Sequence, residues 1–167
     1  MDSMGRAVLI MLTAALVFLL PVYYFAEKQD AVIRSYCLEE TMQFTDAIRN
    51  LGFLSPEMYQ EYQKKIAVSG LLYSIRLERY EKVLIEQEDG SYQNGYRYTD
   101  VLAAPLEEAY HFAAGDLIRI RLQQKTPTLA DRMRSSILGV DVSRMYMNIT
   151  CGGGIRDETV SLWDPVS

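Results

Sequence analysis

The chain has 167 residues, 49% of them hydrophobic and 23% charged, which is typical of a folded protein rather than a disordered or fibrous one. The net charge of −5 falls entirely in residues 27–167, and this acidity argues against a nucleic-acid partner. One histidine and two cysteines are too few for a His/Cys zinc site. We expect no metal, no cofactor and no small-molecule substrate.

The first predicted element is an apolar helix. Residues 7–26 carry no charge, and about 20 apolar residues span a bilayer as a helix. The alternative is a cleaved signal peptide, but a cut after Ala26 would place the bulky Tyr24 at a position that requires a small residue. The aromatic cluster at residues 23–25 instead resembles the belt at a membrane boundary. We therefore predict that residues 1–26 form a short stub and a retained anchor.

The orientation of this anchor is predicted from its flanking residues. Arg6 precedes the span and Lys28 and Arg34 follow it, so the basic residues nearly balance. The short N-terminal stub and the long remainder fit a single-pass protein with a cytoplasmic N-terminus. Residues 27–167 are then an extracytoplasmic α+β domain. Pro21 lies inside the span, where a lipid-embedded helix tolerates the kink that proline introduces.

The apolar helix is predicted to continue without a break through residues 27–51 and to end at Gly52. Apolar residues recur in this second part within an arc of about 60°, at 100° per residue. Glu40 lies in the same stripe and is interpreted as belonging to a fraying or partner-facing turn. We expect the stripe to hold a sheet domain and the span to pack against neighbours. The residues assigned to packing and assembly are Leu9, Leu12, Leu16, Pro21, Ile33, Cys37, Phe44, Ile48 and Leu51.

Two short helices are predicted from their end signals. Ser55 is a favourable N-cap, Pro56 suits the first helical position, and Gly70 marks the end of the first helix. Thr128 caps the second, which ends at Gly139.

Alternating apolar and polar residues predict the strands. They cover residues 73–85, with an irregularity near Tyr80, then residues 118–122 and 140–151, and an edge strand is expected at residues 155–160.

The remaining segments are predicted to be turns and a helix. Asp89-Gly90 and Asn94-Gly95 are turn signals, and residues 99–114 are expected to be helical around residues 105–110. The predicted fold is α+β: a long N-terminal transmembrane-to-amphipathic helix packed on a small, mostly antiparallel sheet with short helices.

Few residues suggest chemistry. Cys37 and Cys151 both fall on inward faces, and the sequence leaves open whether they form a disulfide or remain two buried thiols. His111 is the one imidazole, and a hydrolytic triad with Ser135 or Ser136 lacks a nucleophile-elbow sequence. The glycines at 152–154 lack the Lys-Ser/Thr pair of a phosphate-binding loop and are interpreted as a glycine-rich strand end.

The order of these elements resembles type IV pilins and pseudopilins. Residues 44–52 (FTDAIRNLG) and 54–62 (LSPEMYQEY) are similar to small single-pass proteins of Tad-type pilus or conjugation-like machinery in Gram-positive bacteria. Gly115-Asp116 before an alternating strand and residues 153–158 (GGIRDE) add to the resemblance. It implies a non-enzymatic, membrane-anchored component of a surface filament or secretion apparatus. Its partners would be the lipid bilayer and other pilin-like subunits or assembly proteins.

The sequence departs from the pilin pattern at its N-terminus. Pilins carry a peptidase cut before the apolar helix and a glutamate five residues into the mature chain. Here Gly5 is followed by Arg6, the fifth residue after such a cut is Ile10, and no carboxylate lies between Asp2 and Glu27. The resemblance therefore favours an unprocessed or accessory subunit. The alternatives are a membrane-tethered adaptor or sensor that binds an envelope partner without polymerising, and a tethered hydrolase that uses His111.

Overall fold

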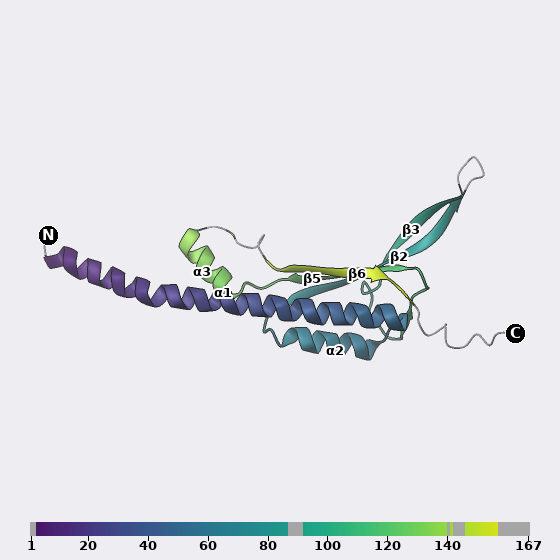
Figure 1. The fold of residues 1–167 in the computed structure, drawn as a ribbon, viewed down its shortest axis with the longest axis horizontal. Coiled ribbons are helices and arrows are strands. Elements are labelled where there is room, and N and C mark those ends of the chain that lie inside the picture. The colour runs from purple at the N-terminus through teal and green to yellow at the C-terminus, as the bar shows by residue number, and fades with distance from the viewer. Residues whose placement is uncertain (1–2, 87–91, 140, 142–145, 157–167) are drawn as a thin grey trace. The chain divides into compact units, whose positions relative to one another are not determined.

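The computed structural model describes residues 3–86, 92–139, 141 and 146–156. The chain divides into two compact units. Unit 1 comprises residues 1–35 with 127–145, and unit 2 comprises residues 36–126 with 146–167. The elements fold as α+β, as predicted (Figure 1).

The long N-terminal helix is confirmed. Helix α1 (Ser3–Leu51) runs without interruption through the apolar residues and the amphipathic residues that follow. Pro21 lies inside it and does not end it. Thr13, a polar residue of the apolar part, donates its hydroxyl to the carbonyl of Leu9 at 2.8 Å, so this hydroxyl has a partner within the helix.

In unit 2, helix α2 (Pro56–Ala67) begins as predicted. The Ser55 side chain accepts a hydrogen bond from the amide of Met58 at 3.2 Å. The helix ends at Ala67, three residues before the predicted Gly70, which takes a positive φ of 72° in the turn that follows. Strand β1 (Phe53–Leu54), between α1 and α2, pairs antiparallel with β4 (Tyr110–His111).

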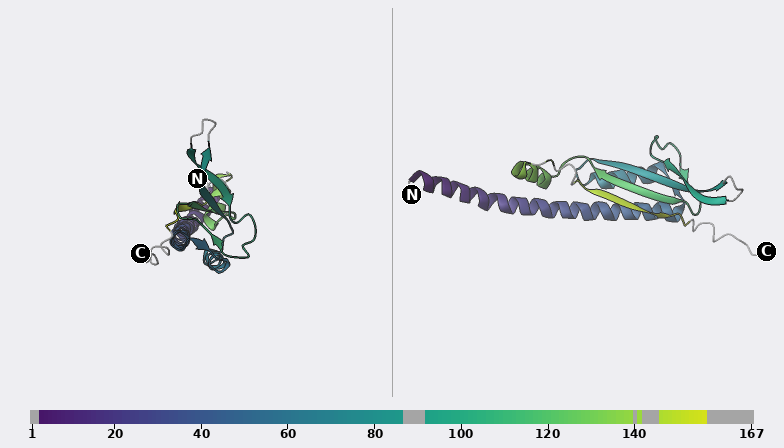
Figure 2. Two further views of the ribbon diagram at one scale, coloured as in Figure 1. Left: turned by 90° about the vertical axis from the view of Figure 1, so that its right-hand side faces the viewer. Right: turned by 90° about the horizontal axis from the view of Figure 1, so that it is seen from above.

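The main sheet of unit 2 has four strands, β2 (Tyr73–Glu86), β3 (Tyr92–Asp100), β5 (Leu117–Gln124) and β6 (Asn148–Gly154). Their order is β3-β2-β5-β6, and every neighbouring pair is antiparallel. Strand β2 pairs with two other strands: its residues 73–80 pair with β5, and its residues 78–86 pair with β3. Beyond Tyr80, β2 and β3 therefore continue as a two-stranded ribbon (Figure 2).

The core of unit 2 lies between the sheet and the second part of α1. Leu77 is paired with Ile120 in the register, so their side chains lie on the same face of the sheet. The Sγ atom of Cys37 contacts the hydroxyl of Tyr73 at 3.4 Å, and Arg49 donates to the carbonyl of Gly154 at 3.1 Å. These two contacts join α1 to strands β2 and β6. The fully buried side chains of this core include Cys37, Thr41, Ile48, Leu54, Leu77, Ile120 and Leu122.

Several local predictions are wrong. Asn94-Gly95 is not a turn, because both residues lie within β3 and pair with Leu84 and Val83 of β2. Residues 101–109 contain no helix, and β4 follows them. No irregularity interrupts β2 at Tyr80, where the strand changes partner instead.

The last predicted strands are only partly recovered. The third strand begins at Asn148 rather than near residue 140, and it ends at Gly154 rather than at Cys151, so the glycines at 152–154 form the end of the strand, as interpreted. Ile149 in the strand and Met147 just before it are both buried. Ile155 and Arg156 do not continue the strand, and the rest of the expected edge strand lies outside the described residues, as does Asp89-Gly90.

Unit 1 consists of the first part of α1 and helix α3 (Leu129–Leu138). The predicted ends of α3 are confirmed: Thr128 and Asp131 form a capping box, and Gly139 is left-handed with φ 64°. Side-chain contacts join α3 to α1, among them the two that follow. Thr128 donates to Asp30 at 2.6 Å, and Arg134 forms an ion pair with Glu27.

Candidate functional site

The apolar part of α1 is exposed on nearly all sides. Leu9, Leu12 and Leu16 are 55%, 57% and 49% exposed, and Pro21 is exposed as well. Among the described residues, α1 is the one helix that is long and apolar enough to cross a membrane, judged by length and composition. A surface of this size without polar groups is unfavourable in water, so these residues form the first candidate interaction surface.

The structure buries only part of the predicted apolar stripe of α1. Cys37, Phe44 and Ile48 are buried, whereas Ile33 is half-buried and Leu51 is 41% exposed. Leu51 is the last residue of the helix, and the chain turns at Gly52 so that Leu54 of β1 enters the core instead.

Two buried threonines of this stripe were missed by sequence reasoning. Thr41 is 0% exposed and Thr45 is 3% exposed. Both donate their hydroxyls to the carbonyl four residues earlier, and Thr41 also shares a hydrogen bond with Tyr62 at 2.9 Å. Their spacing of four and eight residues from Cys37 was the available signal.

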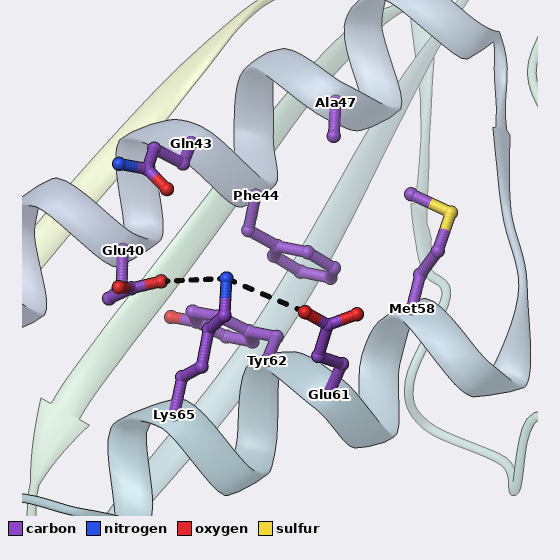
Figure 3. A pocket seen from close by; sticks show the side chains of 8 residues that line it. All are labelled: Glu40, Gln43, Phe44, Ala47, Met58, Glu61, Tyr62 and Lys65. Atoms are coloured by element: carbon purple, nitrogen blue, oxygen red, sulfur yellow. Dashed lines mark ion pairs between the residues drawn. The ribbon is translucent and has the colours of Figure 1, made fainter.

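A shallow cavity of about 250 Å³ lies between α1 and α2 (Figure 3). The rings of Phe44 and Tyr62 stack there with centroids 4.2 Å apart. The ammonium of Lys65 lies 3.3 Å from Glu40 and 3.6 Å from Glu61, which raises the pKa of Lys65 chiefly through Glu40. Glu40 is thus explained by a contact within the chain, and not by the fraying or partner-facing turn that the sequence suggested. The ring stack and the ion pair beside this cavity join α1 to α2.

The two cysteines are free thiols in the structure. Cys37 is buried on α1 and Cys151 is half-buried on β6. Burial raises the pKa of both thiols, so each is held in the protonated form, which is a poor nucleophile. Neither has the environment of a catalytic cysteine.

His111 lies exposed on β4, with its ring 5.8 Å from that of Phe53. Ser135 and Ser136, its suggested triad partners, belong to α3 in the other unit. The described residues include no group of three or more His, Cys, Asp or Glu side chains that could hold a metal ion.

The second candidate surface is the outer face of the sheet in unit 2, opposite the helices. Glu78 on β2 is 5% exposed, although it lies on this face. Arg119 and Arg121 of β5 flank it at 3.4 Å and 3.5 Å, and the Tyr80 hydroxyl donates to it at 3.0 Å. The buried carboxylate therefore fixes two guanidinium groups on an otherwise open sheet.

Aromatic rings complete this outer face. The guanidinium of Arg119 lies over the Tyr80 ring at 5.1 Å, and Tyr80 packs edge-on against Tyr98 at 5.7 Å. A cavity of about 340 Å³ beside them is lined by Tyr96 and Gly152, among others. We call this surface the arginine–tyrosine face and define it as Arg76, Glu78, Tyr80, Tyr96, Tyr98, Arg119 and Arg121.

Fixed guanidinium groups beside aromatic rings suit the binding of a carboxylate or phosphate group. This cluster of arginines is not evident from the composition, because the overall charge is acidic. Its signal was the alternation of Arg119 and Arg121 with buried Ile120, together with Arg76, which pairs with Arg121 in the register.

Comparison with known proteins adds no relative. No family model, no curated protein and no solved structure matches the chain.

Proposed function

We propose that the chain is a non-enzymatic, membrane-anchored, pilin-like structural or accessory subunit of a bacterial surface filament or secretion apparatus. The observation that carries the proposal is a single helix with two kinds of surface. Its apolar part, around Leu12, is exposed on nearly all sides, and its later part, around Ile48, packs on an antiparallel sheet.

The mechanism would be an exchange of neighbours around the apolar part of α1. In the bilayer, lipid covers Leu9, Leu12 and Leu16, and in an assembly the helices of other subunits replace the lipid. The exchange changes the hydrophobic free energy little, because lipid chains are as apolar as leucine. Close packing between the helices therefore decides whether they associate. The lack of any carboxylate between Asp2 and Glu27 means that no glutamate guides this packing, which favours an accessory subunit.

The test compares two leucine-to-arginine variants in cells. Leu12→Arg places a charge in the span at a cost of about 2.5–3.5 kcal/mol, which one residue of a long apolar helix can absorb during insertion. Leu72→Arg is the matched control, because Leu72 is also exposed but lies in unit 2. We expect Leu12→Arg to remain in the membrane fraction and to lose co-purification with filament or secretion components, whereas Leu72→Arg keeps both. Recovery of the unaltered protein only as a detergent-soluble monomer would contradict the proposal.

The arginine–tyrosine face favours a second candidate, a tethered adaptor that binds an anionic envelope partner without polymerising. An Arg119→Ala, Arg121→Ala double variant separates the two functions. The adaptor predicts that this variant loses binding to a polyglutamate peptide, whereas the pilin-like subunit predicts that it still co-purifies with filament or secretion components. Arg97→Ala is the control, because Arg97 is 69% exposed and pairs with Glu81 on the opposite face of β2.

A further inference from the structure

Helix α3 is held beside the end of the apolar span. Thr128, its N-cap, donates to Asp30, and Arg134, further along α3, pairs with Glu27. Glu27 directly follows Ala26, and Asp30 lies about 6 Å beyond Ala26 along the helix at 1.5 Å per residue. Helix α3 therefore heads back toward the N-terminal part of α1, and it leaves α1 at an angle as it proceeds (Figure 1).

The burial pattern in unit 1 shows which face of α1 is covered. Ala26 is 3% exposed and Ala130 of α3 is 0% exposed, whereas Tyr24 and Phe25 on the other side of α1 are 58% and 70% exposed. Small residues at this contact let the two helices approach closely. One side of α1 is thus occupied by protein at the level of the predicted aromatic belt, and the other side is open.

The outward surface of α3 is apolar and basic. Leu129 and Ile137 are 56% and 65% exposed, and with Met133 they fall within an arc of about 80° at 100° per residue. The acidic residue of the helix, Asp131, is buried in the capping box, so the charge that α3 turns outward is that of Arg132, which is exposed.

We propose that α3 is an interfacial helix that lies in the headgroup region of the bilayer, with Ile137 at the acyl boundary, Leu129 closer to water and Arg132 beside lipid phosphate. This inference rests on the membrane anchoring proposed above. The lipid surface is the occupant because the exposed stripe adjoins the end of the span. Its composition, apolar residues with a cation and no outward carboxylate, matches interfacial helices.

Tryptophan quenching in vesicles tests the position of α3. The single tryptophan, Trp163, is replaced by phenylalanine, and the full chain is reconstituted in phosphatidylcholine with a minority of phosphatidylglycerol. New tryptophans are placed one at a time at Leu12, Val32, Leu129 and Ile137. The lipids carry bromine either near the glycerol end or near the middle of the acyl chain.

Depth in the bilayer predicts the order of quenching. Leu12→Trp should lose most emission to the deep bromines, and Ile137→Trp to the shallow ones. Leu129→Trp should be quenched less than Ile137→Trp, because it lies at the Asp30 end of α3. Val32→Trp is the matched control, an equally exposed aliphatic position of unit 1 that lies about 9 Å beyond Ala26 along α1, and it should be quenched least.

The controls separate the two proposals. If Ile137→Trp and Leu129→Trp are quenched no more than Val32→Trp while Leu12→Trp is quenched, the interfacial helix is overturned and the anchor stands. If Leu12→Trp is not quenched either, both are overturned. Both α3 positions are more than half exposed, so neither tryptophan disturbs packed side chains.

Discussion

The two units of this chain differ in how far their leucine side chains are exposed. In unit 2, Leu77 and Leu122 are 0% exposed, whereas in unit 1 Leu9 and Leu12 are more than half exposed. Unit 2 therefore has a core that the hydrophobic effect stabilises in water, and the first part of α1 has none. The difference shows that the chain itself covers the apolar residues of the unit 2 core, whereas the described residues leave those of the first part of α1 exposed.

We expect the largest effect from a substitution that breaks a buried ion pair in unit 2. Asp116 is 2% exposed; it lies 2.7 Å from Arg79 Nε and accepts from the amide of Ala113 at 3.0 Å. Asp116→Ala removes the close, buried partner of Arg79 and leaves only the more exposed Glu81 at 3.7 Å, so it should cost about 3 kcal/mol. Asp46→Ala removes the exposed partner of Arg49 and should cost at most about 1 kcal/mol. Urea unfolding in mild detergent, followed by circular dichroism, measures both, and equal shifts would refute the distinction.

The next prediction applies one substitution to both units. Leu77→Ala opens a cavity in a fully buried site and should lower the free energy of unfolding by about 2–5 kcal/mol. Leu12→Ala removes an exposed side chain and should change the same quantity by less than about 0.5 kcal/mol. The same urea titration compares the two variants. A comparable loss in both would mean that the apolar part of α1 contributes to the core.

A smaller effect is expected at the start of α3. The Thr128 hydroxyl accepts from the amide of Asp131 and donates to Asp30, so one side chain both caps α3 and joins it to α1. Thr128→Ala should destabilise the helix by about 0.5–2 kcal/mol, seen as faster hydrogen exchange of the α3 amides. Ser136→Ala, at an exposed position of the same helix, should leave exchange unchanged.

The smallest effect concerns pH in unit 1. The Tyr23 hydroxyl and, after it, Arg134 hold the pKa of Glu27 below its usual value. The folded state then binds fewer protons at Glu27, so this contribution is complete above the unfolded pKa of about 4.3 and is lost as the pH falls through the folded value. It is worth at most about 1 kcal/mol, because Glu27 is partly exposed.

Asp30 acts in the opposite direction in the same unit. Burial raises its pKa against the hydrogen bond from Thr128, so its contribution is largest in acid and is lost as the pH rises through the folded value. In Asp30→Asn, the protection factors of the α3 amides, which compare the observed exchange rate with the intrinsic rate at the same pH, should therefore fall below about pH 4. Adding Glu27→Gln should abolish that fall, and an unchanged pH profile of the protection factors in the double variant would exclude Glu27 as its source.

Elements with strong local signals were predictable from the sequence. The caps at Ser55 and Thr128 and the alternation in β5 are local features, and the structure confirms them. Asn94-Gly95 is also a local turn signal, yet pairing with Val83 and Leu84 along β2 overrides it. Sequence reasoning weighs neighbours along the chain, and here the partners across the sheet decide.

The candidate surfaces were predictable to different extents. The apolar surface of α1 is a single run of residues and needs no tertiary information. The arginine–tyrosine face joins Glu78 to Arg119, 41 residues later, and exists only once β2 and β5 are in register. The contacts of α3 join Thr128 to Asp30 across 98 residues, so no local pattern indicates them.

The two partners of β2 have a consequence for solubility. Where β2 has left β5, at residues 81–86, its other edge has no ladder partner among the residues that the structure describes, and a bare edge is a template for intermolecular strand addition and fibre growth. Charged side chains stand along this ribbon, with Glu81 directly opposite Arg97 and Lys82 next to Glu81. An incoming strand would have to strip water from these charges. They act as gatekeepers that keep the ribbon from seeding aggregates.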